Sequence, residues 1–172
     1  MNSLLNIVEL PQEKNILEIG AADENFTKNL FLACKEKNNT LTVLHAQNTN
    51  TAILREMHLI PANDSYLMHF SDNSFSCIYI NRLLETLRMD QLYMIFSEAR
   101  RILEGGGTFA IANGTRSKKS WKNFILEKLQ NKNIRELHHY FSPEDWEEIT
   151  YLRNEKYFQP TEFLLLRKLS DK

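Results

Sequence analysis

The segment from Asn15 to Phe26 constrains the fold of this chain more than any other stretch of its 172 residues. It begins with the largely apolar run Ile16 to Ile19, reaches Gly20, and then continues into helical spacing from Phe26. A short apolar run predicts a buried strand, and a glycine at its end predicts a tight turn. A strand that leads through a turn into a helix is a building unit of α/β folds, in which helices cover a sheet.

The rest of the chain alternates between apolar runs and helical spacing, without internal repeats or low-complexity tracts. The expected strands are Ile16–Ile19, Leu41–Leu44, a weakly marked Ser65–Met68, Phe75–Ile80, Thr108–Ala112 and Thr161–Leu169. The expected helices are Phe26–Lys37, Thr51–Met57, Asp90–Leu103, Trp121–Leu129, and one from Ser142 to about Tyr151. Strands that alternate with helices predict β-α-β units and a largely parallel sheet.

Local signals set several boundaries of these elements. Residues 71–74 predict a turn, Asp90 is expected to cap the helix that follows it, and Gly105-Gly106-Gly107 is expected to end that helix. Ser142-Pro143-Glu144-Asp145 combines an N-cap, a first-turn proline and two acids, which predicts a further helix. The turn around Gln159-Pro160 is too short for a helical crossover, so the last two strands are expected to be antiparallel.

Composition bounds the class of protein. With 42% hydrophobic and 25% charged residues, the chain is expected to form one soluble domain over residues 1–172. The net charge of −1 gives no general attraction to nucleic acid or membranes, and we find no secretion signal and no apolar run of the roughly 18 residues that span a bilayer. Cys34 and Cys77 lie in apolar surroundings without metal-ligand spacing. We therefore expect a cytoplasmic protein with buried thiols and no metal site.

Three segments, in this order, resemble the class I S-adenosylmethionine-dependent methyltransferases, most closely the small-molecule group called methyltransferase type 11. Leu17–Ala22 resembles the first cofactor motif, Asn63–Phe75 resembles the run gly-asp-ala-glu-x-leu-pro-phe-x-asp-asn-ser-phe, and Arg100–Gly107 resembles the helix end arg-val-leu-lys-pro-gly-gly. The resemblance covers about Asn15 to Lys168. It implies a Rossmann-like, doubly wound α/β sheet, mostly parallel, with an antiparallel strand pair at the C-terminus.

The resemblance also implies a site for S-adenosylmethionine beyond the carboxyl ends of the strands. Gly20 would let the backbone approach the cofactor, and Ala22 stands where the family usually has a second glycine. Glu18 would hold the methionine amino group, directly or through water. Asp64 would accept a hydrogen bond from the adenine amino group, and the backbone of Ser65 would lie against the adenine ring.

Further positions follow the family or depart from it. Asn81 follows the fourth strand, where the family places residues near the reactive methyl group. Glu24 brings a negative charge to the expected place of the cofactor carboxylate, and two charges about 4 Å apart repel by roughly 4 kcal/mol at a dielectric constant near 20. At the end of the second strand, His45 or Gln47 replaces the family acid that binds both ribose hydroxyls, and either side chain could bond only one of them.

Two hypotheses about function follow. The first is a methyltransferase that acts on a small molecule; the alternative is an inactive pseudo-methyltransferase that serves as a scaffold or regulatory partner and binds the cofactor weakly or not at all. Glu24 and the absent ribose acid favour the alternative, whereas Asp64 and the Asp72–Phe75 turn favour the enzyme. A different ligand in the same crevice is a third possibility. Glu18 could instead be a partly buried acid bonded to turn amides, and Gly20 and Asp64 could serve turn geometry alone.

One basic stretch stands apart from these motifs. Arg116-Ser117-Lys118-Lys119-Ser120-Trp121-Lys122 holds four positive charges and an aromatic ring. It could be a solvated loop, or it could contact a phosphate-bearing partner such as nucleic acid. Apart from this stretch, we expect the partner to be a small-molecule substrate or another protein, and no motif names a catalytic base.

Overall fold

The structure, a computed structural model, describes residues 5, 8–20, 23–45, 58–61, 69–81, 89–114, 141–154 and 161–170. Its strands are β1 (Asn15–Gly20), β2 (Thr40–His45), β3 (His58–Pro61), β4 (Phe75–Asn81), β5 (Leu103–Gly114), β6 (Trp146–Asn154) and β7 (Thr161–Lys168). Its longer helices are α2 (Glu24–Glu36) and α3 (Met89–Ile102). In the described part of the chain, no helix has the length and apolar character needed to cross a membrane.

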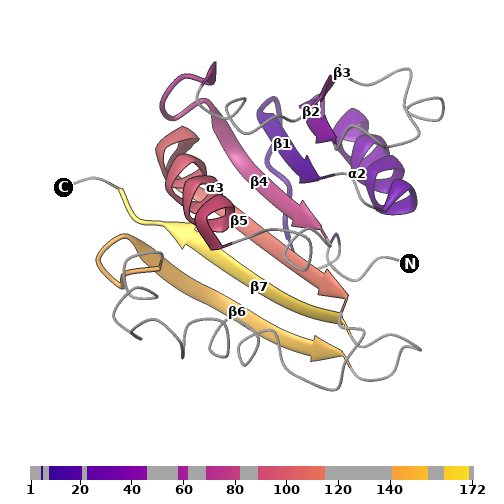
Figure 1. The fold of residues 1–172 in the computed structure, drawn as a ribbon. Helices are drawn as coiled ribbons and strands as arrows, with labels where there is room; N and C mark the ends of the chain where they lie inside the picture. Colours follow the sequence, from indigo (N-terminus) through magenta and orange to yellow (C-terminus); the bar gives the residue numbers. More distant parts are fainter. Residues whose placement is uncertain are drawn as a thin grey trace.

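The strands form one sheet in the order β3-β2-β1-β4-β5-β7-β6 (Figure 1). The first five strands in this order are parallel, and β7 is antiparallel to both of its neighbours, β5 and β6. The prediction of a doubly wound, mostly parallel sheet with an antiparallel C-terminal pair is confirmed. The chain runs outward from β1 to β3 and then returns to place β4 on the other side of β1, so the order reverses between β1 and β4.

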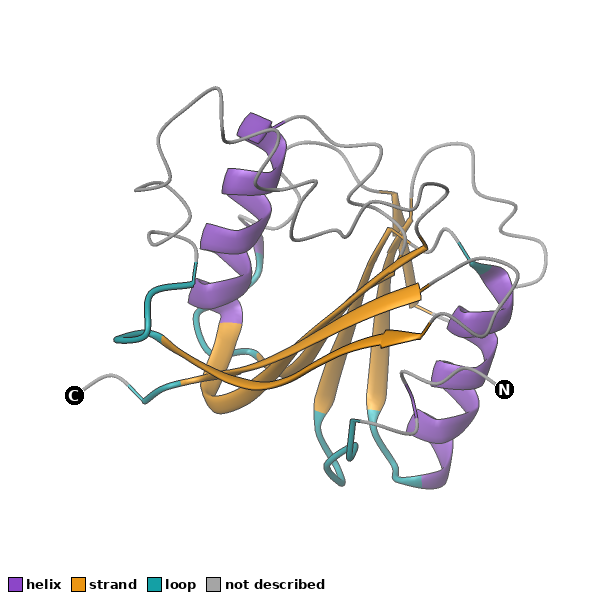
Figure 2. Cartoon of the chain, turned by 90° about the horizontal axis from the view of Figure 1, so that it is seen from below, coloured by secondary structure: helices purple, strands orange, loops and turns teal. Residues whose placement is uncertain are grey.

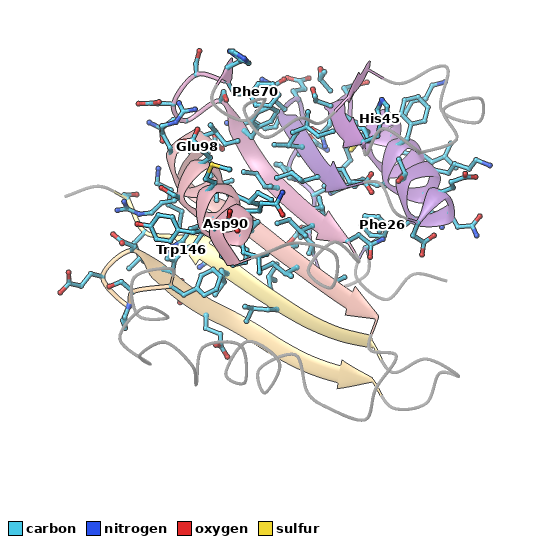
Figure 3. All side chains as sticks on the ribbon, viewed as in Figure 1. Phe26, His45, Phe70, Asp90, Glu98 and Trp146 are labelled. Atoms are coloured by element: carbon cyan, nitrogen blue, oxygen red, sulfur yellow. The ribbon has the colours of Figure 1, made fainter. Side chains whose placement is uncertain are left out.

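The two helices cover opposite faces of the sheet, as the edge-on view in Figure 2 shows. On the face of α3, the core includes Leu17, Ile78, Phe96, Phe109 and Trp146. On the face of α2, it includes Ile16, Phe26, Leu30, Val43 and Tyr79. Phe26 and Trp146, labelled in Figure 3, therefore belong to different cores. Because both faces are covered, neighbouring residues of the central strands are buried in turn, which explains their apolar runs.

Helix α2 begins where the sequence provides an N-cap. The Asp23 carboxylate accepts hydrogen bonds from the backbone N–H groups of Asn25 and Phe26, both at 3.1 Å. Such a cap satisfies donors that the first helical turn would leave unpaired. The buried residues of the helix follow at helical spacing: Phe26, Thr27, Leu30 and Cys34. The helix therefore presents one face to the sheet, as its sequence predicts.

The third strand differs from the prediction. Strand β3 is His58–Pro61, which pairs in parallel with β2, whereas Ser65–Met68 lies outside the described residues. The helices expected at Thr51–Met57 and Trp121–Leu129 also lie outside them. A stretch with two apolar residues and a terminal proline carries little strand signal. Proline is tolerated here because β3 is an edge strand.

The boundaries of α3 differ from the expectation. The helix begins at Met89, so Asp90 lies inside its first turn and does not cap it. It ends at Ile102, before the three glycines, and β5 follows directly from Leu103. The pairing with β4 shifts register across the glycines, from Phe75↔Leu103 to Cys77↔Thr108. The glycines therefore form an irregular start of β5, with Gly106 at a φ of +79°, and do not stop the helix.

The prediction of a helix from Ser142 to about Tyr151 is wrong. The Ser142 hydroxyl does accept a hydrogen bond from the Glu144 N–H at 3.2 Å, but only one turn forms, and Trp146 opens strand β6. β6 pairs with β7 from Trp146 to Asn154, and the Trp146 side chain is 4% exposed. A ladder of backbone hydrogen bonds and burial of the indole outweigh a local capping signal, which contributes only about 1 kcal/mol.

Candidate functional site

The carboxyl ends of three strands meet at the point where the strand order reverses. Gly20, at the end of β1, is in register with His45, at the end of β2. Asn81, at the end of β4, follows directly after the pair Ile19↔Ile80. In open α/β sheets, ligands bind outside the carboxyl ends of the strands at such a switch point. The structure thus brings three of the residues singled out from the sequence to one edge of the sheet.

Gly20 has a backbone conformation that explains why the residue is glycine. Its φ is +106°, in the region that side chains with a Cβ rarely adopt. β1 ends at Gly20, and the N-cap of α2 follows at Asp23. The positive φ agrees with the need for glycine predicted at this position, whereas Ala21 and Ala22 lie outside the described residues.

Glu18 is the most unusual residue near this edge, because its side chain is 0% exposed. It lies in register between Val43 of β2 and Tyr79 of β4, and its Oε1 accepts a hydrogen bond of 2.8 Å from the hydroxyl of Thr27 on α2. No hydrogen-bond donor in the described residues reaches Oε2. Burial raises the pKa of Glu18 to about 8, against the effect of the Thr27 hydrogen bond and with a smaller contribution from Asp23. In the described residues its partner is a helix hydroxyl, and the acid is fully buried where the alternative reading expected partial burial. The turn amides of Ala21 and Ala22 lie outside the described residues.

Two acidic side chains lie at the N-terminus of α2. Glu24 is partly exposed and is the first residue of the helix, and the Asp23 carboxylate binds the N–H groups of Asn25 and Phe26. Negative side chains at this position stabilise a helix by interacting with its dipole. They also occupy the electropositive end of α2, where an anionic group of a ligand would otherwise bind.

His45 and Asn81 are both largely buried, with exposures of 8% and 5%. Phe26 is 1% exposed and packs against Tyr79 with a ring-centroid distance of 5.8 Å, in the core beneath α2. It lies at the end of α2 that follows β1 (Figure 3). Phe26 is therefore a core residue and not a side chain that fills the crevice.

The Asp72–Phe75 turn, whose sequence favours an enzyme, lies at the opposite, amino end of β4. The Asn73 N–H donates to the carbonyl of Arg101 at 3.1 Å and the Ser74 N–H to that of Ile102 at 2.7 Å. The buried ammonium of Lys168 donates to Asn73 Oδ1 at 3.0 Å and to the Leu103 carbonyl at 2.8 Å. These contacts join the start of β4 to the α3–β5 junction, so the turn has a structural role that needs no ligand.

Several predicted residues cannot be placed. Ala22, Gln47, Asp64, Ser65 and the basic stretch Arg116–Lys122 lie outside the described residues. Within the described ranges, no group of three or more histidine, cysteine or acidic side chains is arranged to hold a metal. Cys34 and Cys77 are free and buried, and burial raises the pKa of both thiols to about 12.

Sequence reasoning missed Asp23 and Thr27. Asp23 stands directly before the apolar periodicity of α2, which is the usual signature of an N-cap. Thr27 follows Phe26 and precedes Leu30 by three residues, so helical spacing places it on the buried face. Both could therefore have been found as features of the helix. Only the packing of α2 on the sheet shows that Thr27 contacts Glu18.

Comparison with known proteins identifies a family for more than half of the chain. Residues 17–111, more than half of the chain, match the family described as Methyltransferase domain. No curated protein sequence matches the chain.

Solved structures resemble the chain over nearly all of its length. A SAM-dependent methyltransferase from Methanosarcina mazei has 14% identity and a TM-score of 0.67, with 99% of each chain covered. Geranyl diphosphate C-methyltransferase from Streptomyces coelicolor A3(2), solved with Mg²⁺, geranyl diphosphate and S-adenosyl-L-homocysteine, has 11% identity and a TM-score of 0.65, with 97% of this chain and 77% of that chain covered. The cyclase SpnF has 13% identity and a TM-score of 0.66, with 98% and 79% covered. At these identities, the likeness concerns the fold.

Proposed function

This chain belongs to the class I S-adenosylmethionine-dependent methyltransferase family, and we propose that it binds S-adenosylmethionine and transfers the methyl group to a small molecule. One observation carries the proposal. At the sheet edge between β1 and β4, Gly20 has a φ of +106° and follows the buried acid Glu18 by two residues. A nucleoside-type ligand at the switch point needs a close approach of the backbone, and its amine needs an acceptor.

The residues of this edge suit different parts of the cofactor. Glu18 has a buried carboxyl oxygen without a donor among the described residues, which fits the methionine amino group. We assign Gly20 and Ala22 to the approach of the backbone, His45 to a ribose hydroxyl and Asn81 to the surroundings of the methyl group. Asp64 and Ser65 are proposed to contact the adenine. When bound, the cofactor supplies an electrophilic methyl group, and the protein contributes mainly alignment with the acceptor atom.

A second candidate function rests on the acidic N-terminus of α2. Asp23 already binds two N–H groups of the first helical turn, and Glu24 adds a second negative charge there. The cofactor carboxylate would meet both charges, and the ribose acid of the family is replaced by His45 or Gln47. These features favour a pseudo-methyltransferase that acts as a scaffold or regulatory partner. The methyltransferase fold also occurs in a structure described as a cyclase, so a different ligand at the same edge remains a third candidate.

Calorimetric titration with S-adenosylmethionine and S-adenosylhomocysteine tests the proposal. Micromolar binding by the unmodified protein is expected, and Glu24→Gln is expected to tighten it about tenfold, since water screens a partly exposed charge. Glu36→Gln removes the same charge from the exposed, opposite end of α2 and should bind like the unmodified protein.

The outcomes separate the candidates. Binding by Glu24→Gln alone would favour the pseudo-methyltransferase, because the fold would then have lost its cofactor through local charge. Binding by neither protein would contradict a cofactor site at this edge. Glu24→Gly, which also removes the side chain, distinguishes repulsion by the charge from steric blocking.

We further propose that residues 1–172 work as one methyltransferase-like domain in the cytoplasm, where a reducing environment suits two free thiols. The partner is a small-molecule substrate or, for the second candidate, another protein. A nucleic acid would be contacted only through Arg116–Lys122. Neutralising Lys118, Lys119 and Lys122 would then weaken that contact in a salt-dependent way, and unchanged binding at low salt would contradict it.

A further inference from the structure

The hydroxyl of Thr27 has two neighbours and only one proton to share between them. Its Oγ1 lies 2.8 Å from Glu18 Oε1 and 3.2 Å from the backbone carbonyl oxygen of Asp23. A carbonyl can only accept a hydrogen bond, and so can an ionised carboxylate, whereas a hydroxyl donates once and can also accept. With Glu18 ionised, Thr27 can serve only one of these neighbours at a time. With Glu18 neutral, the acid donates to Thr27 and Thr27 donates to Asp23, so both contacts are satisfied.

The surroundings of Glu18 also favour the neutral acid. Among the described residues, the polar and titratable groups that interact with it are Asp23 at the N-cap of α2 and Thr27 and Cys34 on α2. Val43 of β2 and Tyr79 of β4 lie beside it in register. No lysine, arginine or histidine in the described ranges forms an ion pair with it. A buried carboxylate without a cation or a full set of donors is unfavourable. The elevated pKa of Glu18 has this physical cause.

We propose that Thr27 is a positioning residue that holds Glu18 in two charge states, as the acceptor from the neutral acid and as the donor to the carboxylate, and that binding of the cofactor amine at Oε2 releases the Glu18 proton. The second half rests on the proposed function. The amine arrives as an ammonium group and donates an N–H to Oε2. The Glu18 O–H bond breaks, its proton passes to the buffer, and the Thr27 hydroxyl turns from the Asp23 carbonyl to Oε1.

This arrangement deepens the proposed site in a specific way. Neutral Glu18 carries no charge in the empty protein. When the ammonium group binds and the Glu18 proton leaves, the positive ammonium balances the negative carboxylate, so the net charge of the pair stays zero. Ligands that lack the amine would leave Glu18 neutral. Thr27 therefore connects recognition of the amine to a measurable proton.

A first experiment needs no ligand. The ionisation of Glu18 is followed by carbon-13 NMR of the glutamate carboxyl carbons, with Glu18→Gln used to assign its signal. We expect a midpoint near pH 8, well above that of an exposed glutamate. Thr27→Val, which keeps the shape and removes the hydroxyl, should raise the midpoint by about one pH unit, a tenfold change in the ionisation constant, because the carboxylate loses its donor. Thr27→Ser should restore it.

Two results would overturn the role of Thr27. In the first, Glu18 is already ionised at about pH 5; in the second, the midpoint of the Glu18 titration is the same in Thr27→Val as in the unmodified protein. Because the titration of the unmodified protein is decisive by itself, the first of these outcomes does not depend on the folding of any variant. Far-ultraviolet circular dichroism of Thr27→Val and Thr27→Ser confirms that their helix content is unchanged.

A second experiment adds S-adenosylhomocysteine and measures binding heats in two buffers of different ionisation enthalpy. Near neutral pH, the unmodified protein should release close to one proton per ligand, and its affinity should rise up to tenfold per pH unit until Glu18 ionises. Glu18→Gln should release none, which also measures any contribution from the ligand's own amine. Binding without proton release would overturn the inference alone. Absence of binding, with the Glu18 titration intact, would overturn the proposed function and the ligand half of the inference.

Discussion

Glu18 is a carboxyl group buried between the sheet and α2, and its burial connects stability to pH. Burial raises the pKa of Glu18 to about 8 in the folded protein, against an ordinary glutamate pKa of 4.5 in the unfolded chain. Between these values the folded state binds more protons than the unfolded chain, so this residue lowers the free energy of unfolding as the pH rises.

Glu18→Gln should remove that pH dependence, which amounts to at most about 1.4 kcal/mol per pH unit. Urea unfolding at about pH 5 and about pH 8 measures the slope. Glu36→Gln, at the exposed end of α2, should keep the slope of the unmodified protein. If Glu18→Gln loses stability with pH as steeply as the unmodified protein does, the buried carboxyl is not the cause.

Variants at Gly20 and Gly106 separate the backbone cost of losing a glycine from an effect on the binding site. Both have positive φ, and a Cβ at Gly106 would meet no heavy atom within 4 Å. Each glycine-to-alanine change should therefore cost about 1–2 kcal/mol through the backbone. Only Gly20→Ala, at the carboxyl edge, should also weaken binding of S-adenosylhomocysteine. Urea unfolding and calorimetry of both variants check this, and equal loss of binding in Gly106→Ala would argue against a local effect.

Lys168 is a buried cation on β7 that holds the turn before β4. Lys168→Met removes the donors to Asn73 Oδ1 and to the Leu103 carbonyl and should cost about 2–3 kcal/mol of unfolding free energy, since two acceptors lose a charged partner. Arg167→Met is the matched control, because its ion pair with Glu147 is exposed and should matter by less than about 1 kcal/mol. Urea denaturation gives both values, and equal losses would contradict this role of Lys168.

At the scale of whole elements, the start of α2 combines two functions that oppose each other. Asp23 stabilises the helix as its N-cap and places a negative charge near the proposed cofactor carboxylate. Asp23→Asn keeps an acceptor and removes the charge, so it should retain stability and tighten binding of S-adenosylhomocysteine. Asp23→Ala also removes the cap and should cost about 1 kcal/mol.

Thermal unfolding and calorimetry on these two Asp23 variants separate the effects. Weaker binding by Asp23→Asn than by the unmodified protein would mean that the Asp23 charge is not repulsive towards the ligand. In that case Asp23 would be part of the cofactor site, and Glu24 alone would carry the argument for a lost cofactor.

Strand β6 shows how tertiary pairing decides an element that local sequence misjudges. Ser142 does cap one turn, as its sequence predicts, and the Glu144 N–H donates to its hydroxyl. The strand then forms because β7 lies beside it over the length of β6. A helix there would leave the open edge of β7 unpaired and would take Trp146 out of the core on the α3 face.

At the scale of the whole molecule, the sheet order predicts where the fold is most resistant to opening. β1 and β4 lie near the centre of the sheet, and β3 and β6 form its two edges. Hydrogen exchange should therefore be slowest for the amides of β1 and β4 and faster for those of β3 and β6. Mass spectrometry of deuterium uptake measures this order. Slower exchange in β3 than in β4 would contradict the sheet as described.

Much of this architecture could be predicted from the sequence. β1, β2, β4, β5 and β7 all lie inside the sheet, so the sequence shows each of them as an apolar run. The helices α2 and α3 were recognisable because a helix against a sheet must repeat apolar residues every three to four positions. β3 and β6 could not be predicted, since an edge strand needs few apolar residues and depends on its neighbour.

The site divides in the same way. The sequence by itself determined that a glycine ends β1, because a tight turn after a buried strand requires one. It also showed the acid Glu18 two residues before that glycine. Only the tertiary structure decided that Glu18 is buried beneath α2 and contacts Thr27. It also decided that Gly20, His45 and Asn81 share one edge of the sheet and that the Asp72–Phe75 turn lies at the opposite edge. Burial, charge state and shared edges arise from contacts between segments distant in the chain, and local patterns carry no information about those distances.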